Sequence, residues 1–348
     1  MLSKVKTSYT YSDIGLVPRE VSTITHRSQV NTSTYICDLQ VSLPIIMSPM
    51  RTVSGPEMCE ALSQHKILSF LPRPYDNFED ILSIYSKFEN KKYIGVSIGA
   101  TRDYLKHFQE YRMEGAEIFC IDVANGAHTQ IEHAIKSIQD DASYSDRVKI
   151  ITGNVASVET YMFLAQLKVH GIRIGIGSGS LCSTSIATGI GQGVISILDE
   201  IHEKKCELIA DGVYLPCIIA DGGIREPGDV VKSLAMGADA VMAGSIFAGT
   251  FEAQGDVIKH QGVYYKMYAG EASKMVRRND SYIEGDSTLV KLKGSVNDVV
   301  HTYEDGLRSA MSYMNFKTIK DFKSIKPENI VILSPNSRVE RTPHLVTA

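Results

Sequence analysis

Residues 217–245 read CIIADGGIREPGDVVKSLAMGADAVMAGS, and this stretch gives the clearest indication of the fold class. It begins with the apolar run 217–223 and ends with the apolar run 240–245, and an amphipathic segment separates the two. Near-continuous apolar runs are typical of parallel strands that are buried on both faces, and a helix between two such strands makes a βαβ unit. The stretch therefore predicts a strand, a helix and a second, parallel strand.

The same alternation occurs along most of the chain. Six further apolar runs come before this unit, at 43–48, 67–71, 93–99, 117–123, 148–154 and 172–177. Eight strands with helices between them favour a closed (β/α)₈ barrel, although an open doubly wound sheet has the same periodicity. We expect residues 1–348 to form one barrel domain, because a barrel of this class reaches that length.

Two segments depart from the alternation. Residues 262–294 are polar, contain glycine and have little helical periodicity, so they predict a β-excursion with a flap. The segment from about 317 to 348 is charged, and we expect it to be a loosely ordered tail.

Composition argues against several kinds of partner. The formal net charge is −4 and no run of Lys or Arg forms a basic patch, so we expect no nucleic-acid partner. No stretch has the length of a membrane span and the N-terminus lacks the apolar core of a signal peptide, so we expect no membrane partner and a cytoplasmic location. The 6 cysteines are scattered without C-x-x-C or zinc-ligand spacing, which is typical of free thiols in a reducing compartment.

Polar residues and glycines gather where the predicted strands end. Active sites of (β/α)₈ barrels are built at that face, so their placement indicates an enzyme. They are Ser48 and Met50 after the first run, Asp122 after the fourth, Asn154 after the fifth, the loop 175–180 after the sixth, Asp221, Gly222 and Gly223 after the seventh, and Gly244 and Ser245 after the eighth.

The loop GIGSGSLCST, residues 175–184, is the sharpest local signal. Its glycines allow the backbone to approach an ion or ligand closely. Cys182 at its tip is a candidate thiolate nucleophile, and the Thr184 hydroxyl can pass a proton. A tight turn followed by a buried cysteine would have the same spacing, because a glycine-rich loop is a weak motif.

The loops after the seventh and eighth strands indicate a phosphate site, because barrels of this class often hold phosphate there. Glycines fall at both of these loops, which favours a monophosphorylated substrate over two ordinary βα turns. Asp221 can also accept hydrogen bonds from ribose hydroxyls. Asp122 could hold a second ribose or cap the following helix. Glu284, on the flap, would by default be a solvated surface residue.

Taken together, these segments resemble the inosine-5′-monophosphate (IMP) dehydrogenase/guanosine-5′-monophosphate (GMP) reductase family. The resemblance runs from Tyr11 to Phe322 and rests on GIGSGSLCST (175–184), IADGGIREPGDVVKSLAMGADAVMAGS (219–245), TGNVAS (152–157) and DGLRSAMSYM (305–314). It implies a (β/α)₈ barrel, usually a homotetramer, that binds a purine nucleoside monophosphate (GMP or IMP) and a nicotinamide cofactor.

The resemblance also implies a role for individual residues. Cys182 would attack purine C2, Thr184 and Glu284 would relay a proton, and the backbone carbonyls of Gly177, Gly179 and Cys182 would hold K⁺. The substrate-binding set would be Ser48, Met50, Asn154, Ser180, Asp221, Gly222, Gly223, Gly244, Ser245, Tyr268, Gly270, Glu271, Ala272, Ser273 and Gly285. The cofactor-binding set would be His26, Arg27, Arg73, Asp122, Val123, Ala124 and Asn125, although on composition alone the first three would be surface residues.

Several features favour the reductase branch of the family. The chain has no room for the CBS pair of most dehydrogenases, and Arg277 and Arg278 are separated from Tyr282, so the adjacent Arg-Tyr pair of that branch is missing. The segments DVANG (122–126) and STITHRS (22–28) and the flap pair Glu284-Gly285 are similar to the reductase. The expected activity is NADPH-dependent reduction of GMP to IMP and ammonia. The alternatives are an NAD-dependent IMP dehydrogenase with a minimal flap and a nucleotide-binding barrel without catalysis.

Four positions depart from the family pattern. Ser178 stands in place of a proline, Ser185 in place of an arginine that helps to hold the cation, and Arg51 in place of an aspartate. Glu271 stands in place of a methionine whose backbone faces the purine edge. A carboxylate at that position could accept hydrogen bonds from amino groups of the base, which predicts a preference for amino-bearing purines.

Overall fold

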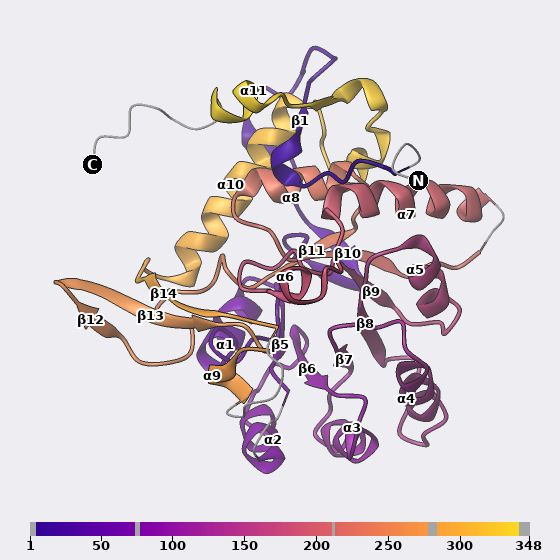
Figure 1. The fold of residues 1–348 in the computed structure, drawn as a ribbon, viewed down its shortest axis with the longest axis vertical. Coiled ribbons are helices and arrows are strands. Elements are labelled where there is room, and N and C mark those ends of the chain that lie inside the picture. The colour runs from indigo at the N-terminus through magenta and orange to yellow at the C-terminus, as the bar shows by residue number, and fades with distance from the viewer. Residues whose placement is uncertain (1–4, 74–76, 211–212, 278–283, 341–348) are drawn as a thin grey trace.

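The computed structural model describes residues 5–73, 77–210, 213–277 and 284–340 (Figure 1). Its centre is a closed barrel of parallel strands in the order β10-β11-β4-β5-β6-β7-β8-β9. The strands are β4 (Ile45–Met47), β5 (Leu68–Leu71), β6 (Ile94–Ile98), β7 (Ile118–Asp122), β8 (Lys149–Val155), β9 (Gly171–Ile174), β10 (Cys217–Asp221) and β11 (Ala240–Ala243). Six of the eight apolar runs contain one of these strands, and the runs 148–154 and 172–177 overlap β8 and β9, which each extend one residue beyond the run. The predicted (β/α)₈ barrel is therefore confirmed.

Helices connect the strands and surround the barrel (Figure 1). Those that follow β4 to β8 are α1 (Pro56–Gln64), α2 (Phe78–Ser86), α3 (Tyr104–Met113), α4 (Thr129–Gln139) and α5 (Val158–Ala165). The short α6 (Thr184–Thr188) and the long α7 (Val194–Ala210) follow β9, α8 (Pro227–Ala235) follows β10, and α10 (Val296–Tyr313) completes the last unit. Asn77, Ser157 and Ser295 cap α2, α5 and α10 by accepting a backbone N–H, as these residue types favour.

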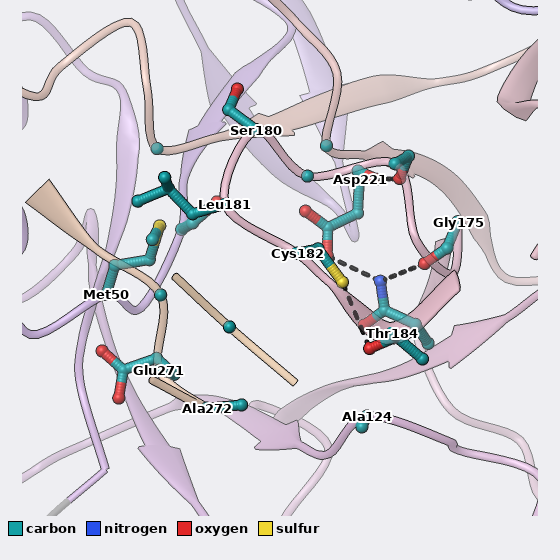
Figure 2. A pocket seen from close by; sticks show the side chains of 18 of the residues that line it. Met50, Ala124, Gly175, Ser180, Leu181, Cys182, Thr184, Asp221, Glu271 and Ala272 are labelled. Atoms are coloured by element: carbon teal, nitrogen blue, oxygen red, sulfur yellow. Dashed lines mark hydrogen bonds between the residues drawn. The ribbon is translucent and has the colours of Figure 1, made fainter. Parts of the chain in front are cut away.

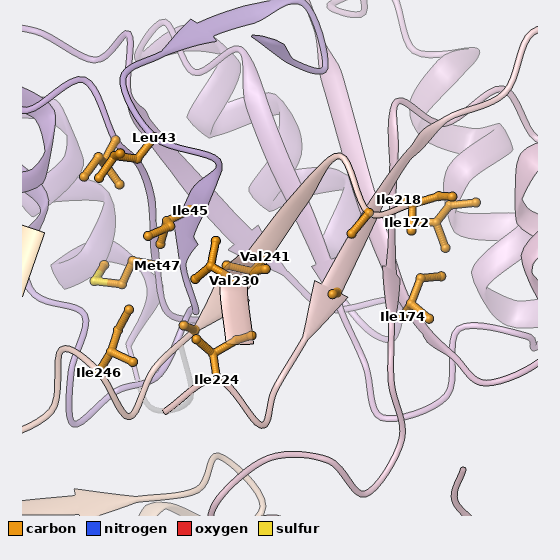
Figure 3. Packing of buried hydrophobic residues seen from close by; sticks show 14 of the residues in the cluster. Leu43, Ile45, Met47, Ile172, Ile174, Ile218, Ile224, Val230, Val241 and Ile246 are labelled. Atoms are coloured by element: carbon orange, nitrogen blue, oxygen red, sulfur yellow. The ribbon is translucent and has the colours of Figure 1, made fainter. Parts of the chain in front are cut away.

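The barrel strands bury both of their faces, which explains why their sequences are continuously apolar. Ile46 and Ile219 belong to a cluster in the barrel lumen. Their neighbours Ile45, Met47 and Ile218 belong to a second cluster between the strands and the helices (Figure 3). Alternate residues of one strand therefore stabilise two different layers.

A hairpin before the first barrel strand closes the amino-terminal mouth of the barrel. It consists of β2 (Thr34–Ile36) and β3 (Leu39–Val41), which pair antiparallel. Ile36 and Val41 are buried in the lumen cluster. We call residues 34–41 the hairpin plug.

The segment 262–294 forms a β-excursion as predicted. Its strands β13 (Val263–Ala269) and β14 (Ser287–Lys291) make an antiparallel sheet with β12 (Ile258–His260), and this sheet projects from one side of the barrel (Figure 1). The short helix α9 (Lys274–Arg277) follows β13. Residues 278–283, the central part of the expected flap, lie outside the described residues.

The expectation of a loosely ordered tail is wrong for residues 317–340. The 3₁₀ helices η4 (Ile319–Ser324) and η5 (Pro327–Asn329) lead into β15 (Ile330–Ile332) and α11 (Pro335–Glu340). β15 pairs antiparallel with β1 (Ile14–Leu16) of the N-terminal segment. This segment also contains the 3₁₀ helices η2 (Tyr11–Asp13), before β1, and η3 (Arg27–Gln29), after β1. The pairing of β15 with β1, together with the buried side chains of Ile319 and Phe322, holds this segment against the barrel. Residues 341–348 lie outside the described part of the chain.

Among the described residues, no helix combines the length and the apolar character that a membrane crossing requires.

Truncation of a lumen side chain is expected to destabilise the barrel. Ile151 on β8 is 0% exposed and belongs to the lumen cluster, so Ile151→Ala should lower the free energy of unfolding by about 2–5 kcal/mol. Ile332→Ala is the matched control, because Ile332 is 64% exposed and its loss should change stability by less than about 0.5–1 kcal/mol. Denaturant unfolding of both variants measures the difference, and equal stabilities would contradict the assignment of the lumen core.

Candidate active site

A cavity of about 280 Å³ lies at the carboxyl ends of the barrel strands (Figure 2). Residues in the last part of, or directly after, β4, β5, β7, β8, β9, β10 and β11 line it, together with residues of the β-excursion. This is the face at which barrels of this class build their active sites.

Most residues singled out from the sequence meet in this cavity. They are Ser48, Met50, Arg73, Asp122, Val123, Ala124, Asn154, Gly177, Gly179, Ser180, Cys182, Thr184, Asp221, Gly222, Gly223, Gly244, Ser245, Tyr268, Gly270, Glu271, Ala272, Glu284 and Gly285. Segments up to 237 residues apart along the chain therefore contribute to one site, since they extend from Ser48 to Gly285.

Four of the singled-out residues do not line this cavity. Ser273 is 1% exposed, and its hydroxyl accepts the backbone N–H of Val276. Asn125 is exposed, and its side chain accepts the backbone N–H of Ala127. His26 and Arg27 line a separate cavity with Ser312 and Tyr313, and that cavity shares no lining residue with the first.

Cys182, Thr184 and Glu284 form a continuous hydrogen-bonded chain. The Cys182 thiol donates to the Thr184 hydroxyl with a sulfur–oxygen distance of 3.2 Å, as Figure 2 shows. The Thr184 hydroxyl in turn donates to the Glu284 carboxylate at 2.8 Å. The direction of these bonds leads from the thiol to the carboxylate, so the arrangement can move a proton along it.

Backbone pairing places Glu284 next to the cysteine loop although 100 residues separate it from Thr184. The amide of Ser183 donates to the Glu284 carbonyl at 3.0 Å, and the amide of Asp286 donates to the Leu181 carbonyl at 2.9 Å. Gly285 also forms a bridge with Cys182. A strand-like contact therefore holds the end of the flap against the tip of the loop.

Arg173, which the sequence analysis did not single out, links the two acidic residues of the cavity. Its Nη1 donates to Asp122 Oδ1 at 2.5 Å, and its Nε donates to Asp221 Oδ2 at 2.9 Å. It is 7% exposed at the end of β9. The signal for it was present in the sequence, because a charged residue inside the apolar run 172–177 needs a buried partner.

The same arginine keeps Asp122 ionised. Burial alone would raise the pKa of Asp122, but the charges of Arg173 and Arg73 outweigh burial and lower it below its ordinary value. The side chain of Asp122 is 13% exposed and lines the cavity, so it presents a carboxylate rather than a carboxylic acid. An ionised carboxylate is a strong acceptor for sugar hydroxyls.

Asp221 is held in place from a second side. The Asn154 amide donates to Asp221 Oδ2 at 2.8 Å and to the Gly175 carbonyl at 2.7 Å. Asn154 and Asp221 are both 8% exposed. Contacts within the protein therefore fix the side chains of Asn154 on β8 and Asp221 on β10 relative to each other.

The loops after β9 and β10 pack tightly against each other. Gly222 has a φ of +88°, and a Cβ atom at this position would lie 2.9 Å from the amide nitrogen of Gly179. Ser178 donates to the Asp221 carbonyl at 2.7 Å, so the serine that replaces the family's proline joins the two loops. Gly222 is thus required for packing between loops as well as for approach to a ligand.

The residues of the expected cation site occupy one turn of the cysteine loop. Gly177 has a φ of +82°, and Ser185 lies against it where the family has an arginine. The Gly179 carbonyl accepts the amide of Cys182 at 3.0 Å and keeps a second lone pair. In the described residues no group of three or more His, Cys, Asp or Glu side chains could hold a metal ion. Backbone carbonyl oxygens are the kind of ligand that K⁺ would need, and the K⁺ site at Gly177, Gly179 and Cys182 remains a prediction.

Glu271 lines the cavity, and one of its carboxylate oxygens accepts the backbone N–H of Arg51. Figure 2 shows this carboxylate on the Met50 side of the cavity, away from Cys182. Two positions that depart from the family pattern are thus in direct contact. Arg278 and Tyr282, which bear on the choice between the two branches of the family, lie outside the described residues.

The fold and the cavity define a barrel enzyme whose active site lies at the carboxyl ends of the strands. The family model of the IMP dehydrogenase/GMP reductase domain matches residues 8–344, and the chain belongs to this family. It is therefore an oxidoreductase.

Curated relatives support this assignment along nearly the whole chain. The chain is 30% identical over 321 residues to a GMP reductase of Clostridium acetobutylicum, covering 91% of this chain and 94% of that protein. It is 29% identical over 317 residues to a GMP reductase of Streptococcus pyogenes serotype M1, covering 91% and 93%. It is 30% identical over 321 residues to a GMP reductase of Mesoplasma florum, covering 91% and 96%.

Proposed function

We propose that the protein is an NADPH-dependent GMP reductase that converts GMP to IMP and ammonia through a covalent bond between Cys182 and purine C2. The observation that carries this proposal is the hydrogen-bonded chain from the Cys182 thiol through Thr184 to Glu284. A nucleophile next to a proton relay is the arrangement that covalent catalysis requires. The similarity to curated GMP reductases supports the same assignment.

Different parts of the cavity bind the parts of the nucleotide. Ser180, Gly223, Gly244 and Ser245 surround the phosphate, at the two loops where barrels of this class hold phosphate. Asp221 accepts the ribose hydroxyls, and Arg173 and Asn154 hold its carboxylate for this purpose. Ser48, Met50, Asn154, Gly222, Tyr268, Gly270, Glu271, Ala272 and Gly285 complete the substrate site.

The chain's own groups then carry out the chemistry at C2. Cys182 loses its proton towards Thr184 and Glu284, and its sulfur adds to C2 of GMP. Glu284 returns a proton through Thr184 to the C2 amino group, which leaves as ammonia. The nicotinamide cofactor supplies the hydride that C2 needs. Cys182 then departs from C2 to release IMP, and the flap excludes water that would divert the reaction to an oxidised purine.

The cofactor and the cation are part of the same proposal. Arg73, Asp122, Val123 and Ala124 line the side of the cavity that would hold NADPH, with the ionised Asp122 accepting its ribose hydroxyls. The carbonyls of Gly177, Gly179 and Cys182 would hold K⁺. His26, Arg27 and Asn125 remain predictions for the cofactor, and Ser273 remains one for the substrate, because they lie outside this cavity.

A spectrophotometric assay tests the proposed function. Consumption of NADPH with GMP should be observed, and formation of NADH from NAD with IMP should not. The opposite result would favour an IMP dehydrogenase with a minimal flap. No change in absorbance with either pair would favour a nucleotide-binding barrel without catalysis.

Glu271 predicts a preference for purines with an amino group. In wild-type protein GMP should bind more tightly than IMP by about tenfold or more, because the amino group of GMP would donate a hydrogen bond to the Glu271 carboxylate that IMP cannot supply. Glu271→Met should reduce this difference. Calorimetry of both nucleotides without cofactor measures it. If Glu271→Met leaves the ratio of the GMP and IMP affinities unchanged, the Glu271 carboxylate binds the Arg51 amide but not the amino group of the base.

We also propose a homotetramer in the cytoplasm. Ile186 and Ile190, next to the cysteine loop, are 87% and 60% exposed, and such apolar side chains favour coverage by another subunit. All 6 cysteines are free, which agrees with a reducing compartment. Light scattering of the purified protein tests the assembly.

A further inference from the structure

The turn of the hairpin plug carries a cysteine in an unusual conformation. Cys37 and Asp38 connect β2 to β3, with φ values of +48° and +67°. A two-residue turn with both φ values positive matches the twist of a hairpin, but it favours asparagine and glycine over cysteine. The surrounding structure therefore holds Cys37 in place, and the contacts of its side chain show how.

Cys37 lies against the amino ends of two barrel strands. Its backbone N–H donates to the sulfur of Cys217, the first residue of β10, at 3.2 Å. Gly171 pairs with Cys217 across β9 and β10. A Cβ atom on Gly171 would lie 3.0 Å from the Cys37 sulfur, so the absence of a side chain there leaves room for this sulfur.

The two thiols are chemically unequal. A hydrogen bond between the Cys37 and Cys217 side chains, with burial, raises the pKa of Cys37 well above its ordinary value. The same hydrogen bond lowers the pKa of Cys217. The pair also faces Lys205, which favours a thiolate on Cys217, and Asp239, which opposes it and is paired with Lys205 at 2.7 Å. Cys217 is thus the more nucleophilic thiol, with Cys37 in contact as a second thiol.

Small reagents have access to this pair from the Cys37 side, through a surface cavity, and Cys217 is itself partly exposed. Cys217 is half-buried, and a surface cavity of about 450 Å³ is lined by Cys37 and Asp38 together with Lys91, Lys92 and Lys149. Neither cysteine lines the cavity that contains Cys182. The pair lies at the opposite end of the barrel strands and has no part in the proposed reaction.

We propose that Cys37 and Cys217 are a redox-modification site that forms a disulfide with peroxide and so fastens the hairpin plug to β10. The Cys217 thiolate attacks one oxygen of hydrogen peroxide, which breaks the O–O bond and leaves a sulfenic acid on Cys217 and one water. The Cys37 sulfur then attacks the Cys217 sulfur and displaces the second water. Two thiols are oxidised by two electrons in total, and one peroxide is reduced to two waters.

The test treats native protein with hydrogen peroxide and maps its peptides after blocking the remaining thiols. We expect a linked peptide that contains Cys37 and Cys217, together with a midpoint of thermal unfolding about 5 °C or more above that of reduced protein. The rise follows because the bond closes a loop between positions 180 residues apart, which restricts the unfolded chain. Treatment with a reductant should reverse both changes.

Matched variants identify the pair. Cys37→Ser and Cys217→Ser should each abolish the linked peptide and the thermal shift, whereas Cys206→Ser, which removes an exposed cysteine on α7, should leave both unchanged. Oxidation of Cys182 or Cys206 without a Cys37–Cys217 peptide would overturn the proposal. So would a linked peptide that forms only in denaturant, or one that leaves the unfolding midpoint unchanged.

Discussion

Replacement of Cys182 by alanine is expected to lower turnover of GMP by on the order of 10⁴-fold or more, because Cys182 is the only thiol among the described residues that line the cavity. Binding of GMP should change by less than about fivefold, since the phosphate and the ribose contact the loops after β10 and β11. Single-turnover kinetics with NADPH and calorimetry with GMP measure the two effects separately.

The control for this prediction is Cys206→Ala. Cys206 is exposed on α7 and does not line the cavity, so its replacement should leave both turnover and binding unchanged. Turnover by Cys182→Ala within tenfold of wild type would exclude the covalent mechanism. Loss of GMP binding in the same variant would instead show that alanine disturbs the loop 175–184.

Replacement of Glu284 by glutamine is expected to slow turnover of GMP by about 10²–10⁴-fold, the usual contribution of a positioned proton relay. Glutamine keeps the size of the side chain and an acceptor for Thr184, but it cannot take up and return a proton. Release of ammonia should therefore slow, whereas binding of the cofactor should change little. Rapid-quench measurement of ammonia in a single turnover measures the affected step.

A double-mutant cycle with Thr184→Val tests whether the two residues act as one unit. If they do, the double variant should be about as slow as the slower single variant, because residues in one hydrogen-bonded chain are not additive. Glu207→Gln on α7 is the control, since the Glu207 side chain is 65% exposed and pairs with the nearby Lys204 at 2.8 Å. Unchanged steady-state and single-turnover rates in Glu284→Gln would remove Glu284 from the mechanism.

The sequence predicted the eight strands, for a physical reason that concerns single strands, whereas closure of the barrel was visible only in the tertiary structure. Runs such as 217–223 and 240–245 are almost continuously apolar up to the residues that end their strands, because both faces of each strand are buried. Glycines and polar residues after those runs likewise predicted the cavity at the carboxyl ends. Cys182, Asp221 and Asn154 could be placed in it without coordinates, because parallel strands bring their carboxyl ends to one face.

Tertiary structure alone decided which of these residues touch. Thr184 and Glu284 are 100 residues apart, and no local pattern predicts that a strand-like contact places the flap against the cysteine loop. The residue Arg173 reads as part of an apolar strand, yet its burial between Asp122 and Asp221 makes it the link between the two sides of the cavity. His26 and Arg27 were grouped with the cofactor site, but the path of the N-terminal segment places them at a separate cavity.

The C-terminal segment and the hairpin plug are two further cases in which contacts between distant segments could not be predicted from the sequence. The charged composition after Lys317 predicted a loosely ordered tail. This prediction was wrong because the composition of a segment gives no information about a distant segment that pairs with it. Pairing of β15 with β1, more than 300 residues away in the chain, and burial of Phe322 provide the order instead. Cys37 and Cys217 are likewise 180 residues apart in the sequence, and only the folded barrel places them in contact. Sequence periodicity reports the burial of each segment, whereas contacts between distant segments depend on how the whole chain packs.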